Sequence, residues 1–142
     1  MEFTGEYRHT IDAKGRLIVP SPMRDALGET VYLSRWMEEC IAMWSEEGWE
    51  EITTKLRALP MSQPGSRRFV RWVMSSAHRD EVDKQGRITV PQKLRDIAGI
   101  TRDATVIGAL GHAEIWDPER LRDQDAMEQT VGFEELAADL NF

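Results

Sequence analysis

Two short runs of the chain, "RLIV" at residues 16–19 and "RITV" at residues 87–90, are mostly apolar and rich in β-branched residues. This pattern is typical of a short strand. Each run is closed by a proline, Pro20 or Pro91, which cannot continue a ladder of backbone hydrogen bonds. An earlier strand is predicted before each run, over residues 7–11 and 77–82.

A polar Asp-x-x-Gly corner joins the two predicted strands of each pair. The corners are Asp12 with Gly15 and Asp83 with Gly86. The carboxylate of such an Asp bonds nearby backbone N–H groups, and the glycine accepts a positive φ. We therefore expect both corners to be tight turns with a defined geometry.

A short helix and two further strands follow each proline. Ser21 and Pro22 predict an N-cap and a first-turn residue, and Gly28 is expected just beyond the end of that helix. In the second half, residues 91–98 form the equivalent helix before Gly99. The strands "TVYLSR" with "CIAMW", and "ATVIGAL" with "AEIW", complete a β-β-α-β-β order in each half.

Longer helical patterns link and end the two halves. Residues 45–59 have a Ser45 cap and one apolar face, and residues 66–77 predict a basic helix with Phe69, Trp72 and Val73 turned inward. Asp117 and Pro118 mark another helix start, and residues 132–142 read as an acidic amphipathic segment that frays or docks on a neighbour.

The two halves are copies of one unit. When the sequence is shifted by 71 positions, identical residues align at many positions of the two halves. One further shift by a single residue then aligns Trp44 with Trp116. The identical pairs include Arg8 with Arg79, Asp12 with Asp83, Gly15 with Gly86, Arg16 with Arg87, Pro20 with Pro91 and Arg24 with Arg95. A unit of about 45 residues with short strands buries too little apolar surface to be stable alone. The copies must therefore pack on each other and interleave.

The predicted fold class is α+β, with two tandem β-β-α-β-β swapped-hairpin units forming a barrel-like core around a pseudo-two-fold axis, and flanking helices. We assign residues 5–50 to the first unit, 51–76 to linking helices and a loop, 77–120 to the second unit and 121–142 to an acidic helical tail.

The net charge of −7 hides a polarised chain. Residues 114–142 carry nine acidic and two basic side chains, whereas residues 66–95 carry eight Lys or Arg against three acids. The acidic total argues against non-specific coating of DNA but is compatible with a local basic face.

Other kinds of site have little support. A lone Cys40 forms neither an internal disulfide nor a multi-thiolate metal site, so we expect a small buried side chain, no metal and no cofactor. No apolar run approaches the ~20 residues of a membrane span, so we expect a cytoplasmic protein without membrane contact. The three histidines, His9, His78 and His112, lack an accompanying nucleophile or phosphate-binding motif, which disfavours an enzyme.

Both "DAKGRLIVP" and "DKQGRITVP" resemble the swapped-hairpin domain of AbrB-like transcription factors. The stretches "GEYRHTIDAKGRLIVPSPMRDALG" and "DEVDKQGRITVPQKLRDIAG" resemble the two halves of the MraZ family, over about residues 3–125. The resemblance implies a nucleoid-associated bacterial regulator of the division and cell-wall gene cluster. It also implies binding to short direct repeats in double-stranded DNA near its own promoter, and assembly of subunits into closed rings.

The resemblance carries DNA contacts onto the corners. Arg16 is the first choice, with Lys14 beside it, and Arg87 is the counterpart of Arg16. In the second corner Ala13-Lys14 becomes Lys84-Gln85, so the positive charge moves by one position. Arg8 and Arg79 are secondary phosphate contacts, whereas Asp12, Gly15, Pro20, Asp83, Gly86 and Pro91 build the structure.

Several alternatives stay open at this point. Arg16 and Arg87 can instead form intramolecular ion pairs with Asp12 and Asp83. An assembly protein without DNA binding, or an AbrB-like antitoxin or sporulation regulator, would share the corner motif; the latter usually carries a single unit. A ring would make contacts with successive DNA repeats intramolecular and thereby raise affinity.

Overall fold

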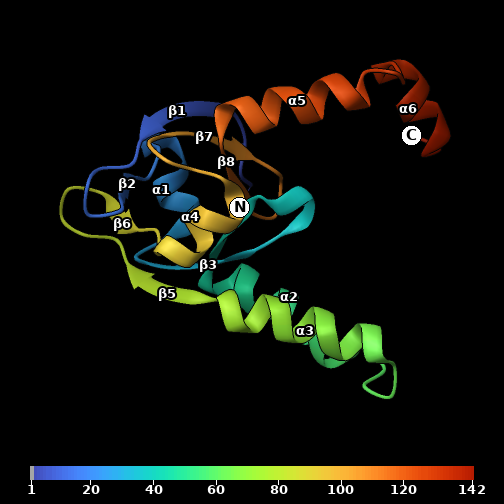
Figure 1. Cartoon of the computed structure of the whole chain (residues 1–142), viewed down its shortest axis with the longest axis horizontal. Helices are drawn as coiled ribbons and strands as arrows, with labels where there is room; N and C mark the ends of the chain where they lie inside the picture. Colours follow the sequence, from blue (N-terminus) through green and yellow to red (C-terminus); the bar gives the residue numbers. More distant parts are fainter. Residues whose placement is uncertain (1) are drawn as a thin grey trace.

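The two copies share one antiparallel sheet. In the computed structural model, which describes residues 2–142, six strands run in the order β1-β7-β8-β4-β3-β5, and β2 and β6 form a separate two-stranded ladder (Figure 1). The first copy supplies β1 (Glu6–Thr10), β2 (Arg16–Ile18), β3 (Thr30–Arg35) and β4 (Ile41–Ser45). The second copy supplies β5 (His78–Glu81), β6 (Arg87–Thr89), β7 (Asp103–Gly108) and β8 (Ala113–Trp116).

The strands are exchanged between the copies. β1 pairs with β7, β5 pairs with β3, and β4 pairs with β8 in the middle of the sheet. The ladder of β2 and β6 likewise takes one strand from each copy. The predicted interleaving is therefore confirmed. The six-stranded sheet does not close into a barrel, because β1 and β5 remain its edges.

One hydrophobic core lies beneath both copies. Leu17 of β2 is paired with Ile88 of β6, and both side chains are buried. The short helices α1 (Ser21–Leu27) and α4 (Gln92–Ala98) contribute Met23 and Leu94 to the same cluster. The predicted Ser21 cap is wrong: α1 begins one residue earlier, with Pro20 at the N-cap and no side-chain cap bond.

The remaining helices project from the end of the molecule opposite the β2–β6 ladder (Figure 1). They are α2 (Glu46–Arg57), α3 (Pro64–Ser76), α5 (Pro118–Glu128) and α6 (Phe133–Asp139); a 3-10 turn, η1 (Met37–Glu39), precedes β4. Ser45 caps α2 by accepting from Gly48 N at 3.0 Å, and Asp117 caps α5 by accepting from Arg120 N at 3.0 Å. Both caps agree with the sequence.

Trp72 of α3 does not turn inward as the helical pattern predicts. Its ring is exposed, and the guanidinium of Arg35 lies 4.5 Å from the ring centroid. This cation–π contact gives the aromatic face a favourable partner while the ring stays exposed. Val73, in contrast, is buried. No helix within residues 2–142 is both long and apolar enough to cross a membrane.

The shared core predicts that both copies unfold together. Leu17→Ala removes a fully buried side chain that packs across the copy boundary, and should lower the free energy of unfolding by about 2–5 kcal/mol. Its neighbour Ile18 is 43% exposed, so Ile18→Ala should cost about 1 kcal/mol or less. Urea unfolding followed by tryptophan fluorescence and circular dichroism should show one coincident transition in each variant; separate transitions would contradict a common core.

Candidate nucleic-acid interface

The first corner is built around the carboxylate of Asp12. Its Oδ1 accepts hydrogen bonds from the backbone N–H groups of Lys14 and Arg16, both at 2.9 Å. Gly15 takes a φ of 80° and donates its N–H to the carbonyl of Asp12 at 2.9 Å. The predicted tight Asp-x-x-Gly turn is therefore present, and it leads directly into β2.

The second corner repeats this geometry. Asp83 Oδ1 accepts from the backbone N–H groups of Gln85 at 2.9 Å and Arg87 at 2.8 Å. Gly86 has a φ of 78°. The residues predicted to be structural, Asp83 and Gly86, thus have the same function in the turn as their counterparts in the first corner.

An arginine from the opposite copy braces each corner. Arg95 of α4 donates its Nε to the carbonyl of Val90 at 2.9 Å, and a Cβ on Gly15 would lie 2.9 Å from its Nη2. The guanidinium of Arg24 in α1 lies still closer to the Cβ position of Gly86. Both glycines also have a positive φ, which other residues rarely adopt. Each corner is therefore held in place by the other copy.

Sequence reasoning gave Arg24 and Arg95 no function. The signal was present, because both arginines recur at the same position of the repeat. Their target was not visible, because each one contacts the corner of the copy in which it does not lie.

Arg16 and Arg87 lie on the same outward face of the β2–β6 ladder. In the antiparallel register Arg16 pairs with Thr89 and Arg87 pairs with Ile18, while Leu17 and Ile88 between them point into the core. Strand geometry therefore separates the two arginine Cα atoms by roughly 8 Å. Strand exchange brings together two side chains that are 71 positions apart in the chain.

Each of these arginines forms an ion pair within its own corner. Arg16 Nε lies 2.8 Å from Asp12 Oδ2, and Arg87 Nε lies 2.9 Å from Asp83 Oδ2. The side chains are 32% and 26% exposed. The intramolecular pairs that the sequence left open therefore exist, but they use one nitrogen of each guanidinium. The aspartates thereby orient the arginine forks.

The terminal nitrogens differ between the corners. Arg87 Nη2 donates to Gln85 Oε1 at 2.6 Å. For the terminal nitrogens of Arg16, no hydrogen-bond partner occurs among residues 2–142. In the first corner both terminal nitrogens of the guanidinium are thus available to a ligand. In the second corner one of the two is already bonded to Gln85.

The surroundings of the corners differ in charge as well. The hollow beside the first corner is lined by two arginines, Arg95 and Arg102, and one acid, Asp12. The hollow beside the second corner is lined by two cations and four acids: Arg24, Lys84, Asp25, Glu29, Glu81 and Asp83. The first corner is therefore the more favourable of the two for an anionic ligand.

The other predicted basic residues lie in two kinds of place. Lys14 and Lys84 are exposed in the turns, next to Arg16 and Arg87. Arg8 is exposed on β1, and Arg79 is exposed on β5 with its Nη1 3.1 Å from Glu81 Oε1. These two strands are the opposite edges of the six-stranded sheet, so Arg8 and Arg79 flank the corners rather than join them.

Comparison with known proteins identifies the family. The family model described as "MraZ protein, putative antitoxin-like" matches residues 2–72 and again residues 73–140. The transcriptional regulator MraZ of Acetivibrio thermocellus is 44% identical over 118 residues, covering 83% of this chain and 82% of that protein. The chain belongs to the MraZ family.

A second MraZ relative extends the match over nearly the whole chain. The transcriptional regulator MraZ of Ligilactobacillus salivarius is 41% identical over 138 residues, covering 97% of this chain and 96% of that protein. The resemblance read from the two corner motifs is thus confirmed, and these MraZ relatives are named as regulators rather than enzymes. Across residues 2–142 no cluster of three or more His, Cys, Asp or Glu side chains is arranged to hold a metal ion. The Cys40 side chain is buried, and this burial raises the pKa of its thiol.

The corner aspartates predict an acid-dependent loss of stability. Backbone and side-chain hydrogen bonds from Arg16 lower the pKa of Asp12, and those from Arg87 lower the pKa of Asp83. An Asp in the unfolded chain has a pKa of about 3.9. The stabilisation that the ionised carboxylates give the folded protein is therefore complete above that pH, and it is lost as the pH falls through the lower folded pKa.

The double variant Asp12→Asn with Asp83→Asn should therefore have a lower free energy of unfolding than the wild type at pH 7. This difference between the two proteins should become smaller below about pH 4. Urea unfolding between pH 7 and pH 3 measures this difference. The matched control is Asp123→Asn on α5, whose carboxylate accepts no hydrogen bond in the part of the chain that the structure describes. A stability difference that stays constant with pH would contradict the role given to these carboxylates.

Proposed function

We propose that this MraZ protein is a sequence-specific regulator that binds double-stranded DNA through the two corners and the outward face of the β2–β6 ladder. The observation that carries the proposal is the convergence of Arg16 and Arg87 on that face, each oriented by an aspartate through its Nε. Membership of a family whose relatives are named transcriptional regulators supports the same conclusion.

The chemistry of the corners suits this ligand. A guanidinium held at its Nε keeps its terminal N–H groups for a second partner, and such a fork bonds guanine O6 and N7 together or clamps a phosphate. Lys14 and Lys84 stand beside the arginines as phosphate contacts, with Arg8 and Arg79 as outer ones. Fixing the guanidinium before binding reduces the side-chain entropy lost on contact.

The first corner is the dominant contact in this proposal. Among the described residues, nothing bonds the terminal nitrogens of Arg16; Lys14 lies next to it, and the adjoining hollow is more basic than acidic. Arg87 shares a terminal nitrogen with Gln85 and is surrounded by more acids.

We further propose that subunits assemble into a ring-shaped homo-oligomer that binds short direct repeats near its own promoter, in the division and cell-wall gene cluster. One subunit offers only a few contacts, which is too little for specific regulation. In an assembly each further corner binds the next repeat intramolecularly, so the overall affinity exceeds that of one site by orders of magnitude. Such a regulator acts in the cytoplasm, associated with the nucleoid.

Arg16→Ala should weaken DNA binding more than Arg87→Ala does. We expect Arg16→Ala to cost about 1–3 kcal/mol per site, roughly 5- to 150-fold in affinity, because it removes the freer fork. The measurement is a mobility shift at several salt concentrations, using the DNA upstream of the protein's own gene.

Arg122→Ala, on the exposed part of α5, is the matched control and should leave the affinity unchanged. A larger loss from Arg87→Ala would reverse the ranking of the corners. If the variant lacking both Arg16 and Arg87 bound DNA as the wild type does, the interface would be wrong. A wild-type protein that assembles but never shifts the DNA would favour an assembly protein instead.

A charge-neutral exchange tests the asymmetry directly. The double variant Lys84→Ala with Gln85→Lys gives the second corner the sequence of the first, "DAKGR", and leaves the net charge at −7. It also removes the amide that holds Arg87 Nη2. Affinity for the same DNA should rise several-fold; unchanged or weaker binding would show that Gln85 does not limit the second corner.

A further inference from the structure

Helix α6 exposes an apolar face that has no partner within the described chain. Phe133, Leu136 and Leu140 recur at helical spacing and are 90%, 52% and 71% exposed. A helix of seven residues is not stable in water by its own backbone hydrogen bonds. The face must therefore be covered for α6 to persist.

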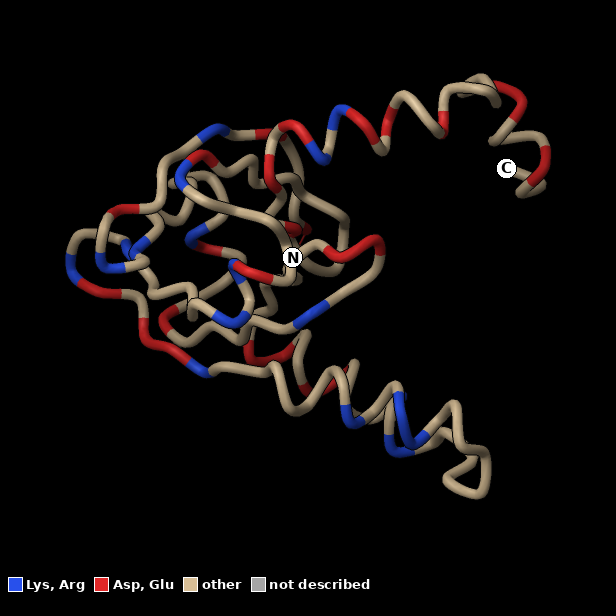
Figure 2. Tube along the Cα trace, viewed as in Figure 1, with Lys and Arg blue, Asp and Glu red and all other residues tan. Residues whose placement is uncertain are grey.

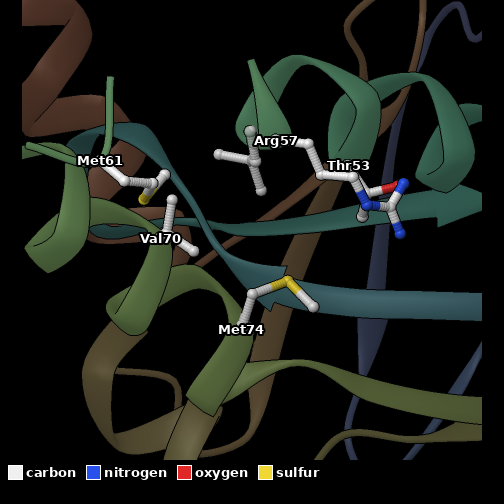
Figure 3. A pocket seen from close by; sticks show the side chains of 6 residues that line it. Thr53, Arg57, Met61, Val70 and Met74 are labelled. Atoms are coloured by element: carbon white, nitrogen blue, oxygen red, sulfur yellow. The ribbon is translucent and has the colours of Figure 1, made fainter. Parts of the chain in front are cut away.

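An apolar groove lies between α2 and α3 (Figure 3). It has a volume of about 370 Å³ and is lined mainly by aliphatic and thioether side chains. The lining residues are Thr53, Leu56, Arg57, Met61, Val70 and Met74. Met61 and Met74 are exposed, and methionine side chains adapt readily to an incoming apolar surface.

The groove and α6 carry opposite charge, although the start of α2, away from the groove lining, holds four glutamates. Residues 52–76, which form most of the α2–α3 hairpin, contain five basic and no acidic side chains. Residues 123–142, which form the outer part of α5 and all of α6, contain six acidic and no basic side chains. Figure 2 shows basic positions on the hairpin and acidic positions along the outer part of the α5–α6 arm. Complementary potentials of this kind favour pairing and select against the wrong partner.

The α5–α6 arm does not reach the groove of its own chain. The first turn of α5 is tied to α4, because Arg120 Nη1 donates to the carbonyl of Ile97 at 2.9 Å. From there α5 runs away from the sheet, and the arm and the α2–α3 hairpin project as two separate prongs (Figure 1). A groove and an apolar helix on separate prongs of one chain point to a contact between two copies.

We infer that α6 of one copy docks, through Phe133, Leu136 and Leu140, into the groove between α2 and α3 of a second copy. The acids Glu134, Glu135 and Asp139 flank this face and meet the arginines of α3. The contact joins two different surfaces, so it repeats from copy to copy and closes into a ring when the rotation allows. This inference rests on the self-assembly proposed above and identifies the surfaces through which the copies would meet.

Disulfide trapping between differently tagged copies tests the contact. Met74→Cys in one copy and Leu136→Cys in the other should give a mixed disulfide dimer on mild oxidation, because single substitutions exclude a link within one chain. The controls are Ser75→Cys and Ala138→Cys, which turn to other faces of α3 and α6 and should link poorly. The wild type controls for the buried Cys40. Equal trapping in the control pairs would overturn the inference.

The native mass by light scattering gives an independent readout. Leu136→Asp should reduce the assembly to monomer, and raised salt should lower the mass of the wild-type assembly because it screens the contacts between α6 and α3. Ala138→Asp adds the same charge on the opposite face of α6 and should leave the mass unchanged. An assembly that withstands Leu136→Asp would overturn the proposed contact while leaving the ring itself in place.

Failure of the interface and failure of the DNA proposal are separable in these experiments. Leu136→Asp should still shift DNA carrying a single repeat, and should lose the added affinity for several repeats. Combined Arg16→Ala and Arg87→Ala should lose DNA binding but keep the mass and the Met74–Leu136 trapping. A monomeric wild type would overturn the docking and the ring together, without touching the corner assignment.

Discussion

The structure depends on one constraint: neither copy of the repeat can bury its own strands. Leu17 pairs with Ile88 of the other copy within one shared core, and the edge strands β1 and β5 each pair with a strand of the other copy. Duplication within one chain supplies the partner permanently and avoids the association entropy that two separate chains would lose. The single core is the direct consequence, and it fixes where every other feature lies.

The same exchange sets the geometry of the candidate site. A corner from one copy rests on an arginine from the other, Arg95 under Gly15 and Arg24 under Gly86. Within each corner an aspartate accepts backbone N–H groups with one oxygen and the guanidinium Nε with the other. The arginine side chains are thus positioned before any ligand arrives. An intramolecular ion pair and an external contact are compatible here, because the guanidinium has more than one edge.

Pseudo-symmetry has not kept the corners equal. Gln85 occupies a terminal nitrogen of Arg87, and acidic side chains gather beside the second corner. The charge of the chain is also separated in space, with the corners at one end of the molecule and, at the other, an acidic α5–α6 arm and the basic side of the α2–α3 hairpin (Figure 2). Binding of an anion and contact between copies can therefore take place on different surfaces.

Sequence alone determined the elements and the motif. The Asp-x-x-Gly corners, the strands before Pro20 and Pro91 and the caps at Ser45 and Asp117 follow from local conformational preferences, and the repeat itself required two copies to share a core. The tertiary structure decided which side chains are in contact. The bracing of the corners by Arg24 and Arg95 and the exposure of Trp72 beneath Arg35 depend on positions in space that no local rule specifies. Strand exchange is the main reason, because it places Arg24 and Arg95 against corners that lie about half a chain away.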